Sequence, residues 1–96
     1  MLEEVKKALR ITSSAFDSEV ENLIEAAKID LVQAGVDETK VNATMPDAII
    51  KQAIIYYCKA YFGYDNPDAE RFENVYTMFK QHLSLYGDYR SFPNET

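Results

Sequence analysis

The sequence predicts an all-α protein, a small bundle of three to four antiparallel helices that forms a single domain over residues 1–96. The chain has 96 residues, of which 47% are hydrophobic and 27% charged, a size and balance typical of one globular domain with a modest core. Apolar residues recur at helical spacing in long segments, and glycine, proline and polar capping residues separate these segments. Short connections favour antiparallel neighbours.

Residues 2–10 predict a short first helix. Leu2, Val5 and Leu9 share one face. Acidic residues lie at the start of this segment and basic residues towards its end, where the helix dipole favours each charge. A helix this short is marginal alone, so its apolar face must pack on the rest of the chain.

Residues 15–34 predict the second helix, whose continuous apolar stripe comprises Phe16, Val20, Leu23, Ile24, Ala27 and Leu31. Ser14 followed by Asp17 fits a capping-box start. Gly35 is placed to end the helix in the left-handed conformation. Residues 36–43 then form a polar connection with room for one helical turn, which Val36 and Val41 pin to the core.

Residues 47–63 predict the central helix. Thr44 with Asp47 matches another capping box, Pro46 suits a first helical turn, and Gly63 ends the helix. The segment is apolar almost all round, which is typical of a helix buried on nearly all sides. In so small a chain the other helices are expected to cover only part of it. The surplus apolar face therefore indicates a neighbouring subunit.

Residues 67–86 predict the last helix. Asn66 is the expected cap and Pro67 the first helical residue. The core-facing stripe comprises Phe72, Tyr76, Phe79, Leu83 and Tyr86. Gly87 ends the helix, and residues 87–96 are predicted to form a flexible tail.

No catalytic, metal or cofactor site is expected. His82 is the only histidine and has no marked nucleophile or acid beside it. Cys58 lies among aromatic residues, where an apolar setting makes a thiol inert. Asp65, Asn66 and Asp68 do not fit a calcium loop, because Glu70 and Tyr76 stand where glycine and glutamate are required.

Charge and hydropathy exclude further classes. The formal net charge of −6 disfavours a protein that tracks phosphates, although it is compatible with one that surrounds DNA and repels it. No apolar run is long enough to cross a membrane. A single cysteine indicates a reducing compartment.

Aromatic residues are concentrated in the second half of the chain, where eleven of the twelve lie from Tyr56 onward. Several of them exceed what one small core can hold, and tyrosine suits half-buried protein interfaces. We therefore expect a subunit or partner interface that includes Tyr56, Phe62, Tyr64, Tyr86, Tyr89 and Phe92.

The order of segments resembles the head-tail connector (head completion) family of tailed phages and prophages. The likeness covers about residues 2–90 and rests on packing and turn residues in LEEVKKALRI, EVENLIEAAKIDLVQAGV, DAIIKQAIIYYCKAYFGYDNPDAERF and LSLYGDYR. It implies a non-enzymatic protein that assembles as a ring beneath the portal vertex, matched to a dodecameric portal. The ring extends the DNA channel and docks the stopper or tail.

The resemblance implies four partners: further copies of the chain, the portal protein, a stopper or tail-completion protein, and DNA that passes through without sequence-specific binding. It places the protein in the virion neck, and in the bacterial host cytoplasm during assembly.

A head-to-tail ring contact needs two different surfaces on each subunit. One is expected on the outer face of the central helix and its turn, at Ile55, Tyr56, Lys59, Phe62 and Tyr64. The other is expected around Glu70, Arg71 and Glu73, or on the second helix. Arg71 could pair with a neighbour's carboxylate or within its own turn. The tail, with Tyr86, Tyr89, Arg90 and Phe92, is a candidate for ordering on contact with the portal or the next ring.

Two other functions remain open. One is a small cytosolic adaptor or regulator that uses the same aromatic surface. The other is a small enzyme subunit whose site His82 completes across an interface.

Overall fold

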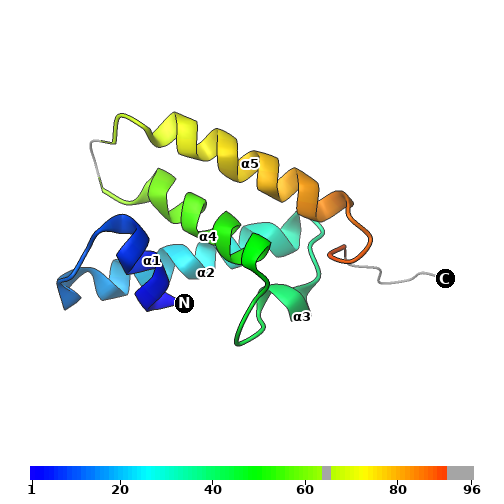
Figure 1. Cartoon of the computed structure of the whole chain (residues 1–96), viewed down its shortest axis with the longest axis horizontal. Coiled ribbons are helices and arrows are strands. Elements are labelled where there is room, and N and C mark those ends of the chain that lie inside the picture. Colours follow the sequence, from blue (N-terminus) through cyan, green and yellow to red (C-terminus); the bar gives the residue numbers. More distant parts are fainter. Residues whose placement is uncertain (64–65, 91–96) are drawn as a thin grey trace.

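The computed structural model describes residues 1–63 and 66–90 and confirms the all-α class. Within these residues there is no regular strand, only an isolated antiparallel bridge between Val36 and Arg90. The elements are α1 (Leu2–Leu9), a 3₁₀ turn (Ser14–Phe16), α2 (Asp17–Gln33), α3 (Glu38–Val41), α4 (Ala48–Tyr61) and α5 (Ala69–Leu85) (Figure 1).

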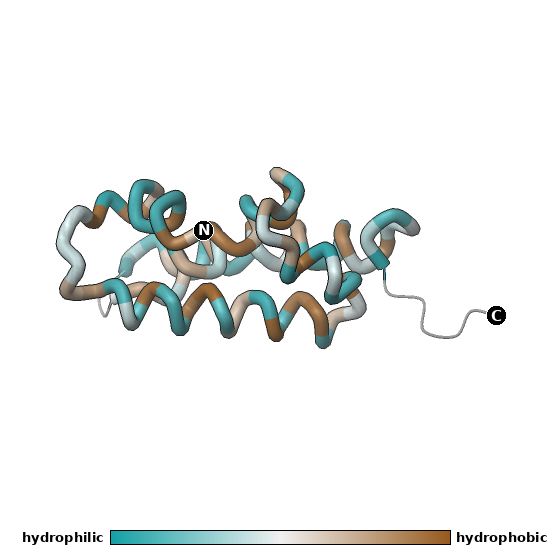
Figure 2. Tube along the Cα trace, turned by 90° about the horizontal axis from the view of Figure 1, so that it is seen from below, coloured by the Kyte–Doolittle hydropathy of each residue, from teal (hydrophilic) through white to brown (hydrophobic). Residues whose placement is uncertain are grey.

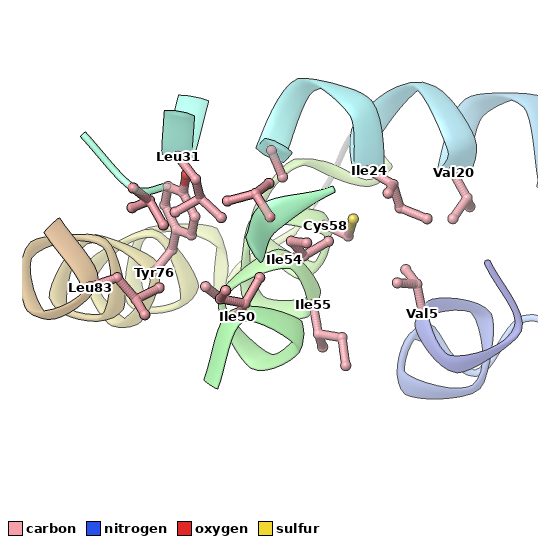
Figure 3. Close-up of a cluster of buried hydrophobic side chains, with 14 residues drawn as sticks. Val5, Val20, Ile24, Leu31, Ile50, Ile54, Ile55, Cys58, Tyr76 and Leu83 are labelled. Atoms are coloured by element: carbon pink, nitrogen blue, oxygen red, sulfur yellow. The ribbon is translucent and has the colours of Figure 1, made fainter. Parts of the chain in front are cut away.

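Helix α4 lies at the centre of the bundle, with α5 along one side and α1 and α2 on the others (Figure 1). Figure 3 shows how its side chains divide among these neighbours. Ile54 and Cys58 point towards Ile24 on α2, whereas Ile50 points towards α5. All three side chains of α4 are completely buried. Three helices of the same chain therefore enclose most of α4.

The prediction that α4 keeps a surplus apolar face for a neighbouring subunit is wrong for its middle turns. Ile55 is only 7% exposed, because α1 packs over it and brings Val5 opposite its side chain (Figure 3). Helix α1 thus covers the apolar face of α4 that the sequence pattern left without a partner. The same packing stabilises α1, which would be marginal as an isolated helix of eight residues.

The C-terminal ends of α2 and α4 agree with the sequence prediction, because a glycine follows each of them. Gly35 and Gly63 have φ angles of 105° and 85°, the left-handed region that glycine enters without steric cost. The predicted Ser14 cap is wrong, because the side chain of Ser13 accepts the Ala15 N–H at 3.0 Å. Asp17 instead forms an ion pair with Lys6 at 2.7 Å.

The expected cap at Thr44 is also wrong. Helix α4 begins one residue after Asp47, and Pro46 lies before the helix rather than in its first turn. Helix α5 begins at Ala69, two residues later than expected. Asn66 still organises this start, because its Oδ1 accepts the Asp68 N–H at 3.1 Å while its Nδ2 donates to the Lys59 carbonyl at 2.6 Å.

The residues that follow α5 are fixed to the bundle as far as Arg90. Helix α5 ends at Leu85, before Gly87. The Asp37 N–H donates to the Tyr89 carbonyl at 2.7 Å, and the Tyr89 hydroxyl donates to Asp47 at 2.9 Å. Residues 89 and 90 therefore contact the bundle, and the flexible tail over residues 87–96 stays a prediction. Residues 91–96, with Phe92, lie outside the described residues.

The connection between α2 and α4 agrees with the sequence prediction. It holds one helical turn, α3, and both Val36 and Val41 are completely buried. The side chain of Asp37 caps this turn by accepting the Thr39 N–H at 2.9 Å. This connection and the Tyr89 segment lie together at the end of the molecule from which the C-terminus leaves (Figure 1).

Candidate functional site

The first predicted interface patch is largely occupied by contacts within the chain. The Tyr56 ring stacks on Phe79 at 5.9 Å and lies 6.0 Å from Phe72. The Lys59 ammonium lies 5.2 Å above the Tyr56 ring. These contacts show that α5 packs on the Tyr56 side of α4, whereas α1 covers Ile55.

The turn end of that patch is more open. Phe62 is half-buried and meets Phe16 edge-on at 5.6 Å. This pair joins the end of α4 to the start of α2. Tyr64, the last predicted member, lies outside the described residues.

The second predicted patch, at the start of α5, is mostly exposed. Glu70 is exposed, and Arg71 pairs with Asp68 of its own turn at 3.7 Å. Glu73 accepts a hydrogen bond from the Tyr61 hydroxyl. Of the two roles left open for Arg71, pairing within its own turn is the one observed, and its side chain remains 68% exposed.

The predicted tail residues divide in two. Tyr86 is exposed and its ring contacts His82 at 4.2 Å. Tyr89 is held against the bundle, and exposed Arg90 pairs through its backbone with Val36. The segment after α5 therefore presents Tyr86 to solvent and holds Tyr89 in contact with the bundle.

One side of α5 faces α2 through a network of polar groups. The Tyr76 hydroxyl donates to Asp30 at 2.6 Å, and the Lys80 ammonium contacts the same carboxylate oxygen at 3.0 Å. Tyr57 and Tyr61 line the same cleft of about 380 Å³. Tyr76 and Lys80 both bind Asp30, so this side of α5 is a structural contact with α2.

The network shifts the pKa values of its members. Burial acts to raise the pKa of Asp30, but the hydrogen bonds from Tyr76 and Lys80 outweigh it and lower that pKa. Burial and the bond to Asp30 raise the pKa of Tyr76. The hydrogen bond to Glu73 raises the pKa of Tyr61 to about 12. Each shift favours the protonation state that forms the observed bonds.

The opposite side of α5 is apolar and open. Together with the start of α4 it forms a groove of about 360 Å³, lined by Ile49, Val75, Met78, Phe79 and His82. Met78 is 67% exposed, and Leu85, further along the helix, is 75% exposed. Leu85 lies two turns beyond Met78, and an apolar groove that continues into exposed apolar side chains is typical of a surface that binds a partner.

These residues form a regular stripe that the sequence reasoning missed. Val75, Met78, His82 and Leu85 follow one another at intervals of three, four and three residues, the spacing of a seam that packs against another helix. The core stripe of Tyr76 and Leu83 hides this signal, because the two stripes are interleaved along one helix. A search for a second 3–4 repeat on α5 would have found it.

The described residues offer little for catalysis. Cys58 is buried, and burial raises the pKa of its thiol to about 12, which makes the thiolate scarce. Residues 1–63 and 66–90 contain no group of three or more potential metal ligands. None of the helices in this part of the chain is long and apolar enough to cross a membrane.

The described residues form a small helical bundle with an open apolar groove on α5, which is typical of a surface that binds another protein. A comparison with known protein families identifies the family to which the chain belongs. The model of the phage connector protein family matches residues 1–90, and the chain belongs to this family. The predicted resemblance is thereby confirmed, and with it a structural role in the phage particle. No curated protein and no solved structure matched the chain.

Proposed function

We propose that this protein is a non-enzymatic head-tail connector that assembles as a ring beneath the portal vertex. The observation that carries the proposal is the open apolar stripe of α5 in a chain of the phage connector family. While Met78 and Leu85 stay in water, as in the monomer, their side chains contribute no hydrophobic free energy. Burying them against a partner supplies a favourable hydrophobic contribution to assembly.

The α5 stripe is the surface proposed to dock on the portal protein. Its 3–4 spacing suits a helix or a ridge of apolar side chains on the partner. Tyr86, which is exposed directly after α5, continues this surface.

The acidic charge of the chain suits the passage of DNA, and the side of the ring away from the portal is available for the stopper or tail. The chain carries sixteen acidic and ten basic residues, so a ring of many copies repels a DNA duplex and lets it slide through the lumen. The face of the ring opposite the portal docks the stopper or tail-completion protein. The protein then resides in the virion neck, and in the host cytoplasm before assembly.

The test is the mass of the purified protein by light scattering over a concentration series, alone and with a portal protein. We expect a ring-sized species, in solution or on the portal. A strict monomer or dimer in both conditions would contradict the proposal and favour the small adaptor.

A pair of variants tests the docking surface. Met78→Asp is expected to abolish portal binding, because it places a charge in the apolar stripe. Gln81→Asp adds the same charge at another exposed position of α5 and is expected to leave binding intact. Equal binding by both variants would remove the stripe from the interface.

A further inference from the structure

The two helices that form the apolar groove carry little of the acidic charge of the chain. Of the sixteen aspartate and glutamate residues, none lies in α4 and two lie in α5, Glu70 and Glu73. The same two helices hold four of the ten lysine and arginine residues: Lys51, Lys59, Arg71 and Lys80. The groove therefore lies between helices that together have no negative net charge, in a protein whose formal net charge is −6.

The α5 stripe begins one turn earlier than its apolar residues indicate. Arg71 precedes Val75 by four residues, so it continues the repeat that runs to Leu85 on the same side of the helix. The Arg71 side chain is 68% exposed, and its guanidinium lies 5.1 Å from the centre of the Phe72 ring. A cation therefore occupies the end of the stripe that is nearest the start of α5.

A second cation lies beside the same ring. The Lys59 ammonium, from α4, is 5.4 Å from the centre of the Phe72 ring and 5.2 Å from that of Tyr56. Among the described residues, Lys59 has no carboxylate partner. The cationic end of the stripe, defined as Lys59 and Arg71, is thus assembled from two helices.

Nearby carboxylates neutralise the cationic end only in part. Asp68 lies 3.7 Å from Arg71, but both side chains are more than half exposed, and an exposed pair contributes little. Glu70 is exposed and points about 100° round the helix from Arg71. Glu73 binds Tyr61 in the cleft on the other side of α5. One carboxylate, that of Asp68, therefore lies beside two cations.

The described residues offer no second stripe that would match this one. Outside α5 and Tyr86, the large hydrophobic side chains that are exposed lie on four different segments: Phe16, Ile29, Met45 and Tyr61. In α2, hydrophobic and hydrophilic residues alternate along one long side of the molecule (Figure 2), and Ile29 is its one exposed large hydrophobic side chain. A matching apolar helix must therefore come from another protein.

We propose that the portal protein offers the α5 stripe an amphipathic helix with carboxylates at one end of its apolar face, and that Lys59 and Arg71 bind those carboxylates. This rests on the proposed function, which takes α5 as the surface that docks on the portal. Apolar side chains of the partner, at 3–4 spacing, fill the groove beside Met78. Its carboxylates meet the cationic end, and opposite charges fix the register of the two helices.

The composition of the groove favours such a helix over a nucleic acid. Its lining is apolar apart from His82, and apolar walls contribute free energy when they bury apolar side chains of a partner. A phosphate backbone instead requires cations along its whole path. The two cations here lie at one end only, where a guanidinium suits a carboxylate through paired hydrogen bonds.

The experiment measures how tightly the full chain binds purified portal protein. We expect Lys59→Glu, Arg71→Glu to raise the Kd at least about tenfold, because carboxylates then face carboxylates. The Kd of the parent chain should rise between about 0.05 and 0.5 M sodium chloride, since salt screens exposed charges, and the double variant should lose that rise. Circular dichroism and thermal unfolding verify that each variant is folded.

Two control variants separate charge from packing and from net charge. Lys59→Arg, Arg71→Lys keeps both charges and should bind as the parent chain does. Lys7→Glu, Arg10→Glu makes the same change in net charge at two exposed cations of the α1 end, and it should also bind as the parent does. A tenfold weakening by either control contradicts the proposal.

A cross-link and a charge swap identify the partner carboxylates. A carbodiimide cross-linker should join Lys59 to an aspartate or glutamate of the portal protein. Replacing that portal residue by lysine should restore binding of the Lys59→Glu, Arg71→Glu variant, since opposite charges then meet again. A swap that restores nothing contradicts a direct contact.

The outcomes separate the cationic end from the docking surface on which it depends. A parent chain that does not bind the portal, or Met78→Asp binding as tightly as the parent, overturns the docking surface and the cationic end together. Loss of binding by Met78→Asp with no effect of the charge reversal overturns the cationic end alone. If the reversal instead weakens duplex binding or changes the mass of the ring, with portal binding intact, the two cations belong to DNA or to the contact between copies.

Discussion

The two sides of α5 differ in chemistry and in burial: one is polar and packs against α2, and the other is apolar and exposed. Towards α2, Tyr76 and Lys80 share one carboxylate oxygen of Asp30. Towards the start of α4, the groove walls are apolar, and Met78 projects into solvent. A single helix therefore has one side that completes the monomer and one side that the monomer leaves uncovered.

This difference separates residues that hold the fold from residues available for assembly. Hydrogen bonds to a charged group are among the stronger contacts in a folded protein, so the α2 side fixes the position of α5. The other side then holds its apolar side chains at fixed spacing without any partner. The backbone of α5 is already ordered, so docking costs the conformational entropy of the stripe's side chains but not that of its backbone.

The largest expected effect comes from comparing two leucines of α5. Leu83 is completely buried and Leu85 is 75% exposed. Leu83→Ala is expected to lower the free energy of unfolding by about 3 kcal/mol, because it leaves a cavity. Leu85→Ala should change it by less than about 0.5 kcal/mol. Urea denaturation of both variants checks this, and similar losses would show that the open side also holds the fold.

The next effect concerns the polar side. Tyr76→Phe removes a hydrogen bond to Asp30, and we expect a loss of about 1–3 kcal/mol in the free energy of unfolding. Asp30→Asn should cost a similar amount. In a double-mutant cycle the two changes should be strongly non-additive, since both break one contact. Additive losses would mean that the two residues act separately.

The same contact predicts a dependence of stability on pH. The pKa of Asp30 is lowered from its ordinary value of 3.8, so its stabilising contribution is present above that value and lost as pH falls through the folded-state pKa. The pKa of Tyr76 is raised from 10.0, so its contribution is present below pH 10 and lost as pH rises further. Thermal unfolding across pH should show both losses, and Asp30→Asn should flatten the acid side.

The smallest expected effect comes from a second tyrosine–carboxylate hydrogen bond, which is more exposed than that of Tyr76. Tyr61 donates to Glu73 as Tyr76 does to Asp30, but Tyr61 is exposed. Tyr61→Phe is therefore expected to cost less than about 1 kcal/mol, because water replaces the lost partner. A loss as large as that of Tyr76→Phe would show that the Glu73 contact is as important as the buried one.

The sequence predicted the fold well where a pattern is local. Helical spacing located every long helix, and the glycines after α2 and α4 marked their ends. The caps at Ser14 and Thr44 failed because several neighbouring polar residues offer the same chemistry, and tertiary contacts choose among them. Asp17, for example, pairs with Lys6 rather than capping its own helix.

The candidate site was harder to predict because exposure is a property of the whole fold. Ile55 and Met78 are both apolar helical residues, and the sequence favoured the first as an interface residue. Only the position of α1 over Ile55 decides that it is buried. Met78 has no such cover, although nothing in its local sequence says so.

The central place of α4 also has a consequence for biosynthesis. Val5 on α1 and Ile24 on α2 pack on α4, which the ribosome makes after both of them. The first two helices emerge without the surface that shields their apolar faces, so they must wait for residues 48–61 before a core can form. We therefore expect a chain that ends before residue 48 not to form this core.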